Sequence, residues 1–145
     1  MSSGPAPATK SLCAKRSSRK IRSSGGARPT LTLLTGMSRG AKDHANEMGP
    51  AGALGHRGLH GSWPTERINR YGRWREAVGE TIYYGEGDAR EMVMWFIIDD
   101  GIPGRDHRRT MFNPLFHVIG VGCGAHATYG TICVLTFAGA YREAR

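Results

Sequence analysis

The fold of this chain is decided by residues 79–122, which read GETIYYGEGDAREMVMWFIIDDGIPGRDHRRTMFNPLFHVIGVG. Asp88 suits the N-cap of a helix, and Glu91 at the third helical position completes a variant of the capping box. Residues 92–97 are apolar around most of the helix circumference, so the pattern predicts a helix that is buried on more than one side. The helix is expected to end at Asp99, where two acidic residues precede a glycine.

Extended segments lie on both sides of this helix. Residues 82–84 form a short β-type run, and residues 117–122 and 130–138 have the composition of strands. The glycine-rich stretch between the last two predicts a hairpin. Cys123 and Cys133 would lie at equal distances from its turn, so a cross-strand disulfide fits the geometry, and two free buried cysteines are the alternative.

The part of the chain before this region predicts two further helices. Over residues 35–48, apolar positions recur at a helical spacing and form one face, and Gly49 with the following proline ends the helix. His44 lies on that face, where a core histidine bonded to a carbonyl is favoured over a ligand. A shorter helix is expected from a cap at Ser62 to about Tyr71.

Length and composition are those of one loop-rich domain. The 145 residues suffice to bury a core, and the 21 glycines and 7 prolines favour an irregular fold over a helical bundle. The predicted element order is helix, short helix, strand, helix, strand, strand. Helices combined with an antiparallel sheet indicate an α+β layer fold.

The basic charge of the chain belongs to its N-terminal part. The net charge is +8, yet residues 1–42 contain nine Lys and Arg and no acid, whereas residues 43–145 contain eleven Lys and Arg and twelve acids. Residues 1–28 have few large apolar side chains and are predicted to be a disordered basic tail. A transit peptide and a nucleic-acid-binding arm are the alternatives to a plain solvated tail. We therefore expect nucleic-acid binding only through this tail.

Several classes of protein are disfavoured by what the sequence lacks. It has no apolar run long enough for a transmembrane segment and no apolar stretch of a secretory signal at its start. Three cysteines are too few for a disulfide scaffold. No HExxH, CxxC, GxSxG or phosphate-loop motif occurs, so the sequence does not indicate a zinc protease of that type, a serine hydrolase or a nucleotide-binding protein.

Four short motifs lie in and around the fold-determining segment. They are Gly79-Glu80-Thr81, Asp106-His107-Arg108, Phe112-Asn113-Pro114 and Ile119-Gly120-Val121-Gly122. Their order and spacing resemble the CAP superfamily, whose domains are also called SCP domains, in its bacterial-like branch; the first two look like the family's GEN and GHR motifs. The resemblance implies a CAP domain over residues 29–145. Its fold would be an α-β-α sandwich with a small, mainly antiparallel sheet, and the family's first helix would be missing.

The resemblance also implies a cleft that bears two histidines and two acidic residues. The matching residues are His56 or His60 for the first histidine, Glu80 for the first acid, Asp99 or Asp100 for the second acid, and His107 for the second histidine. These residue types suit a divalent metal, zinc above all, because imidazole nitrogens bind first-row metals and carboxylates complete or orient such a site. The predicted metal ligands are His56, Glu80, Asp99 and His107, with His60 and Asp100 as further cleft residues.

The function implied by the resemblance is binding rather than catalysis. Its relatives are secreted proteins with roles in defence and cell-surface interaction, and some branches bind sterols or lipids. We therefore expect a non-enzymatic, extracellular module whose partner is a lipid or sterol, or a cell-surface protein or glycan. The alternative is a metal-dependent hydrolase in which Glu80 is the general base. No catalytic residue is assigned, and each cleft residue also has a purely structural interpretation in a loop or turn.

Overall fold

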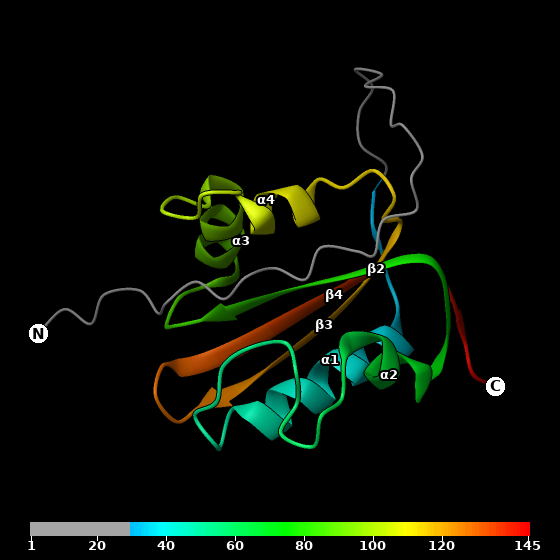
Figure 1. Ribbon diagram of the computed structural model, residues 1–145, viewed down its shortest axis with the longest axis horizontal. Coiled ribbons are helices and arrows are strands. Elements are labelled where there is room, and N and C mark those ends of the chain that lie inside the picture. Colours follow the sequence, from blue (N-terminus) through cyan, green and yellow to red (C-terminus); the bar gives the residue numbers. More distant parts are fainter. Residues whose placement is uncertain (1–29) are drawn as a thin grey trace, which may run out of the picture.

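The computed structural model describes residues 30–145, so the predicted basic tail and the question of a missing first helix lie outside the described part. The strands are β1 (Thr32–Leu33), β2 (Gly72–Tyr84), β3 (Val118–His126) and β4 (Gly130–Glu143). The helices are α1 (Thr35–Met48), α2 (Pro64–Asn69), α3 (Ala89–Ile98) and α4 (Asp106–Met111). The sheet lies between α1 and α2 on one face and α3 and α4 on the other (Figure 1). This is the predicted α+β sandwich.

The sheet has the strand order β1-β3-β4-β2. β4 pairs with both β3 and β2 in antiparallel fashion, whereas the two-residue β1 is parallel to β3. β2 is much longer than the predicted run of residues 82–84. Glu80 therefore lies within the strand and not before it. The sequence pattern did not indicate a strand in the early part of β2. A register shift interrupts the pairing of this part between Arg75 and Val78, where Glu76 has a φ of 73°.

The boundaries and the apolar face predicted for α1 are confirmed. Its buried residues include Met37, Ala41, His44, Ala45 and Met48. The helix lies directly on β3 because Gly120 and Gly122 have no side chains. A Cβ atom on Gly120 would lie 2.2 Å from the carbonyl carbon of Met37, and one on Gly122 would lie 2.2 Å from the amide nitrogen of Lys42.

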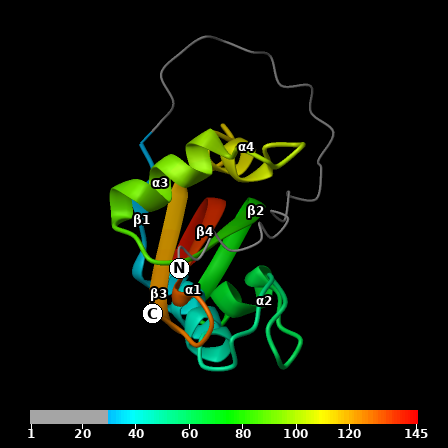
Figure 2. The same ribbon diagram turned by 90° about the vertical axis from the view of Figure 1, so that its left-hand side faces the viewer.

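α3 begins at the predicted cap but is less buried than predicted. The side chain of Asp88 accepts a hydrogen bond from the amide of Glu91, and the Glu91 carboxylate accepts one from the amide of Asp88. Phe96 is buried, whereas the exposed apolar residues of the helix are Val93, Met94 and Ile98. The prediction of burial on more than one side is therefore wrong, because no described element covers the outer face of α3 (Figure 2).

α2 begins later and ends earlier than predicted. Its N-cap is Trp63, so the predicted cap at Ser62 is wrong. The carboxylate of Glu66 accepts a hydrogen bond from the Trp63 amide at 2.7 Å, which is the bond that the third helical residue makes in a capping box. The helix ends at Asn69 because the chain enters β2 at Gly72.

Two short elements were not predicted. β1 is only two residues long and depends on its pairing with β3, so no local pattern marks it. α4 is a six-residue helix of mostly polar residues, and it carries the motif around His107. Within residues 30–145, no helix is long and apolar enough to cross a membrane.

The hairpin of β3 and β4 is covalently closed. Cys123 and Cys133 are direct partners in its register and form a disulfide bond. Cys133 is buried in the same apolar cluster as Phe96 and Phe137. The bond therefore lies on the face of the sheet that carries α3.

Candidate functional site

Glu80 is fully buried in β2 and both of its carboxylate oxygens are engaged. Oε1 is hydrogen-bonded to Nδ1 of His56 at 2.9 Å, and Oε2 accepts a hydrogen bond from Nη2 of Arg67 at 2.7 Å. Thr136, the residue opposite Glu80 in β4, also donates to Oε2 through its hydroxyl, at 3.4 Å. The first predicted acid and the first predicted histidine are therefore in direct contact.

Arg67 of α2 connects this carboxylate to the loop that carries His56. Its Nη1 donates to the carbonyl oxygens of His56 and Ser62 at 3.1 and 2.9 Å, and its side chain is only 1% exposed. Burial opposes ionisation of Glu80, but the hydrogen bond with His56 and the charge of Arg67 outweigh it and lower the Glu80 pKa. Glu80 is therefore an ionised carboxylate held in place by a histidine and an arginine.

His44 of α1 extends the same buried cluster. Its Nε2 is hydrogen-bonded to the carbonyl oxygen of Gly55 at 2.8 Å, which is the carbonyl-bonded core histidine that the sequence predicts. Its Nδ1 is buried and has no partner within residues 30–145. Burial and the nearby charge of Arg67 lower the pKa of His44, so the imidazole is neutral at physiological pH.

A second acid and histidine form a pair between α3 and α4. Asp99 is the C-cap of α3 and has a left-handed backbone with a φ of 47°. Its Oδ1 lies 2.8 Å from Nδ1 of His107, and its Oδ2 accepts the backbone amides of His107 and Arg108. Asp100 is exposed and accepts the amide of Gly101. Of the two acids that the sequence left open, Asp99 is therefore the partner of His107.

The Nε2 atom of His107 is buried and has no hydrogen-bond partner within residues 30–145. The imidazole ring packs against the side chains of Trp95 and Phe96, with centroid distances of 5.4 and 5.5 Å. An unsatisfied buried polar atom costs about 1–3 kcal/mol. Asp99 favours the tautomer with the proton on Nδ1, which leaves a lone pair on Nε2. A carboxylate on one ring nitrogen and a free lone pair on the other is the usual state of a metal-binding histidine.

The two pairs lie in different helical layers. Glu80 is bound by residues of α2 and the loop before it, whereas His107 packs against α3 on the other face of the sheet (Figure 2). In the part of the chain that the structure describes, no group of three or more His, Cys, Asp or Glu side chains could hold a metal ion. In each pair the acid binds the histidine, so the carboxylates orient the rings. A single ion shared by His56 and His107 stays a prediction.

His60 lies apart from both pairs. Its backbone amide donates to Glu47 of α1 at 2.8 Å, and its ring lines a separate polar pocket. His56 is therefore the histidine that contacts Glu80. Arg67 was missed by the sequence analysis, because an arginine in a short polar helix is normally exposed and no periodic signal distinguishes a buried one.

Comparisons with known proteins identify the family of the chain. The model of the cysteine-rich secretory protein family, CAP, matches residues 19–137. Among solved structures, an outer surface protein from Borrelia burgdorferi is similar with a TM-score of 0.64 and 21% identity, over 77% of this chain and 78% of that one. An extracellular protein with an SCP domain from Bacillus anthracis str. Ames is similar with a TM-score of 0.58 and 18% identity, over 77% of this chain and 34% of that one. No curated protein matches the chain. The chain belongs to the CAP family of cysteine-rich secretory proteins.

Proposed function

We propose that this domain is a non-enzymatic binding module that holds a divalent metal ion, zinc above all, at His107. The observation that carries the proposal is the buried Nε2 atom of His107, which has no partner within residues 30–145 while Asp99 holds the other ring nitrogen. A metal ion at Nε2 would satisfy this atom and remove the cost of its burial.

The residue type at this site suits an ion of the zinc class, because imidazole nitrogens bind first-row metals. His107 would bind through Nε2, since its Nδ1 is held by Asp99. Asp99 would orient the ring rather than bind the ion. The bound ion would supply a Lewis-acidic centre to which an oxygen or nitrogen atom of a partner can bind.

Zinc titration of the full chain by calorimetry tests this proposal. We expect saturable binding by the wild-type protein, loss of binding in His107→Ala and unchanged binding in His117→Ala, which removes an exposed histidine as a matched control. Asp99→Asn should weaken binding by about 10- to 100-fold, because the ring loses its orienting carboxylate. Equal binding by wild type and His107→Ala, or no binding by a folded wild-type protein, would refute the proposal.

The alternative function is a metal-dependent hydrolase, and the geometry at Glu80 favours it less. A general base needs a free oxygen and a pKa near the working pH. Both oxygens of Glu80 are engaged and its pKa is lowered. Hydrolysis of a peptide or phosphodiester substrate that is abolished both by chelation and by His107→Ala would nevertheless favour the enzyme.

We further propose that the module acts outside the cell. The two similar structures are described as an outer surface protein and an extracellular protein, which supports this location. The exposed apolar residues Val93, Met94 and Ile98 on α3 would support binding of a lipid, a sterol or a cell-surface protein. Transfer of lipid or sterol between vesicles, lost in Met94→Ser, would favour the lipid partners. No transfer would favour a protein or glycan.

A further inference from the structure

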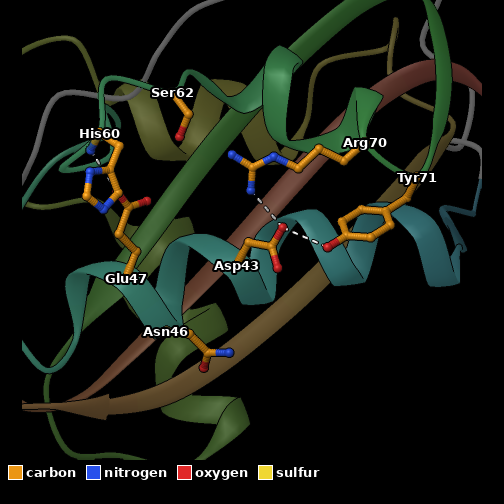
Figure 3. A pocket seen from close by; sticks show the side chains of 7 residues that line it. All are labelled: Asp43, Asn46, Glu47, His60, Ser62, Arg70 and Tyr71. Atoms are coloured by element: carbon orange, nitrogen blue, oxygen red, sulfur yellow. Dashed lines mark hydrogen bonds and ion pairs between the residues drawn. The ribbon is translucent and has the colours of Figure 1, made fainter.

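A polar pocket lies between α1 and the chain segment that includes α2 (Figure 3). Its volume of about 460 Å³ is within the range of small-molecule sites. One wall is formed by Asp43, Asn46 and Glu47 of α1, and the other residues come from the loop before α2 and the turn after it. None of these residues belongs to the His–carboxylate pairs described above.

The two walls of the pocket are held together by hydrogen bonds. Oδ2 of Asp43 accepts bonds from Nη1 of Arg70 at 2.8 Å and from the Tyr71 hydroxyl at 2.9 Å (Figure 3). Oε1 of Glu47 accepts the backbone amide of His60 at 2.8 Å. Because these bonds already fix the acidic side chains, a ligand would lose little free energy in ordering the pocket.

The pocket also contains one buried polar group that has no partner within residues 30–145, which is the Ser62 hydroxyl oxygen. Gly58 packs closely against it, since a Cβ atom at this position would lie 2.7 Å from Oγ of Ser62 and 2.6 Å from Oε2 of Glu47. The Asn46 amide and the His60 ring line the same pocket. A ligand hydroxyl that reached Oγ of Ser62 would satisfy a buried group that otherwise lacks a hydrogen bond.

The chemistry of the lining selects a class of ligand. The Asp43 carboxylate is paired with Arg70, so its charge is balanced within the pocket. The remaining groups are mixed: Oε2 of Glu47 only accepts hydrogen bonds, whereas the amide of Asn46 and the hydroxyl of Ser62 both donate and accept. A ligand that matches such an array must also donate and accept at neighbouring positions, and the hydroxyl groups of a sugar do so.

We propose that this pocket is a binding site for a neutral saccharide. The site is separate from the His107 metal site, and neither proposal depends on the other. The predicted glycan partner would therefore bind in this pocket. Asn46 and Glu47 would form hydrogen bonds with the sugar hydroxyls, and Ser62 would lie at the base of the pocket.

The test is binding of three neutral disaccharides, cellobiose, chitobiose and lactose, to the full chain by saturation-transfer and chemical-shift NMR. We expect at least one of them to bind and to shift the side-chain amide signal of Asn46. Affinity should fall at least about tenfold in the double variant Asn46→Ala/Glu47→Gln, which removes the equivalent of one or two hydrogen bonds. Gly58→Ala should weaken binding, because a methyl group at this position would displace the side chains of Glu47 and Ser62.

Two controls make the result decisive. Glu86→Gln removes an exposed carboxylate outside the pocket and should bind as wild type does. Putrescine serves as a charged amine probe, because the charge of Glu47, which has no ion pair within residues 30–145, is the competing explanation for any binding. The proposal is overturned if none of the disaccharides binds, if the pocket variants bind them as wild type does, or if putrescine binds and the sugars do not. His107→Ala should leave sugar binding intact, which separates this test from that of the metal site.

Discussion

Arg67 is a fully buried arginine whose guanidinium connects Glu80 of β2 to the carbonyls of two loop residues. We expect Arg67→Met to reduce the free energy of unfolding by about 3–5 kcal/mol, because it leaves the Glu80 carboxylate buried without its cation. Arg70→Met is the matched control. Its ion pair with Asp43 is partly exposed, so its loss should cost at most about 1 kcal/mol. Urea unfolding of the two variants measures the difference, and equal losses would contradict this account.

His44 makes the stability of the folded state depend on pH. Burial and Arg67 lower its pKa below the ordinary value of 6.5, so the unfolded chain takes up a proton at a higher pH than the folded chain does. The stability from this group is therefore complete above that value and is lost as the pH falls toward the folded pKa. Glu80 adds a further loss at lower pH, because its pKa lies below 4.5.

The prediction is that His44→Asn makes unfolding stability less dependent on pH between neutrality and mild acid. The exposed His117→Asn should keep the wild-type slope, since this change leaves the buried cluster around His44 intact. Urea unfolding at a series of pH values measures both slopes. An unchanged slope in His44→Asn would show that other groups control the acid sensitivity.

At the scale of elements, the close contact of α1 with β3 depends on two glycines. A methyl group at Gly120 would meet backbone atoms of Met37, which cannot move aside as a flexible side chain would. We expect Gly120→Ala to reduce the free energy of unfolding by about 1–3 kcal/mol, the usual cost of overpacking. Gly124→Ala on the same strand is the control, because its nearest neighbour would be 3.8 Å away. Thermal unfolding of the two variants should therefore differ clearly, and similar midpoints would refute the close contact.

We expect the disulfide bond of the β3–β4 hairpin to make a measurable contribution to the free energy of unfolding. The bond joins residues that are 10 positions apart, so it restricts a short loop in the unfolded chain. Replacing Cys123 and Cys133 together with serine should lower the free energy of unfolding by about 2–3 kcal/mol. The comparison requires urea unfolding of the oxidised wild type and the double variant. Identical stabilities, or free thiols in the wild type, would contradict the pairing.

The sequence predicts the elements that carry their own local signal. The apolar spacing of α1 and the capping residues Asp88 and Glu91 of α3 place two helices correctly. β1 was missed because its structure depends on pairing with β3, and the first half of β2 was missed because a register shift interrupts its pairing. The exposure of Val93 and Met94 was also missed, since an apolar helix pattern does not reveal whether a second element covers it.

At the scale of the whole molecule, the arrangement of the two helical layers separates the candidate site into two acid–histidine pairs. The resemblance to the CAP family implied His56, Glu80, Asp99 and His107, and the fold places them as two pairs rather than one cluster. The sequence could not assign the pairs to layers, because that depends on which face of the sheet each helix covers (Figure 2). Arg67 and the polar pocket likewise arise from tertiary packing. The metal site at His107 is therefore the part of the account that most needs a direct measurement.

The most direct measurement is the imidazole NMR spectrum of the full chain as zinc is added, with the signals of His107 assigned by comparison with His107→Ala. We predict that the apo protein carries the His107 proton on Nδ1, facing Asp99, and that zinc shifts the Nε2 resonance of this ring. A proton found on Nε2 in the apo protein, or a His107 spectrum that does not respond to zinc, would contradict a metal site at His107.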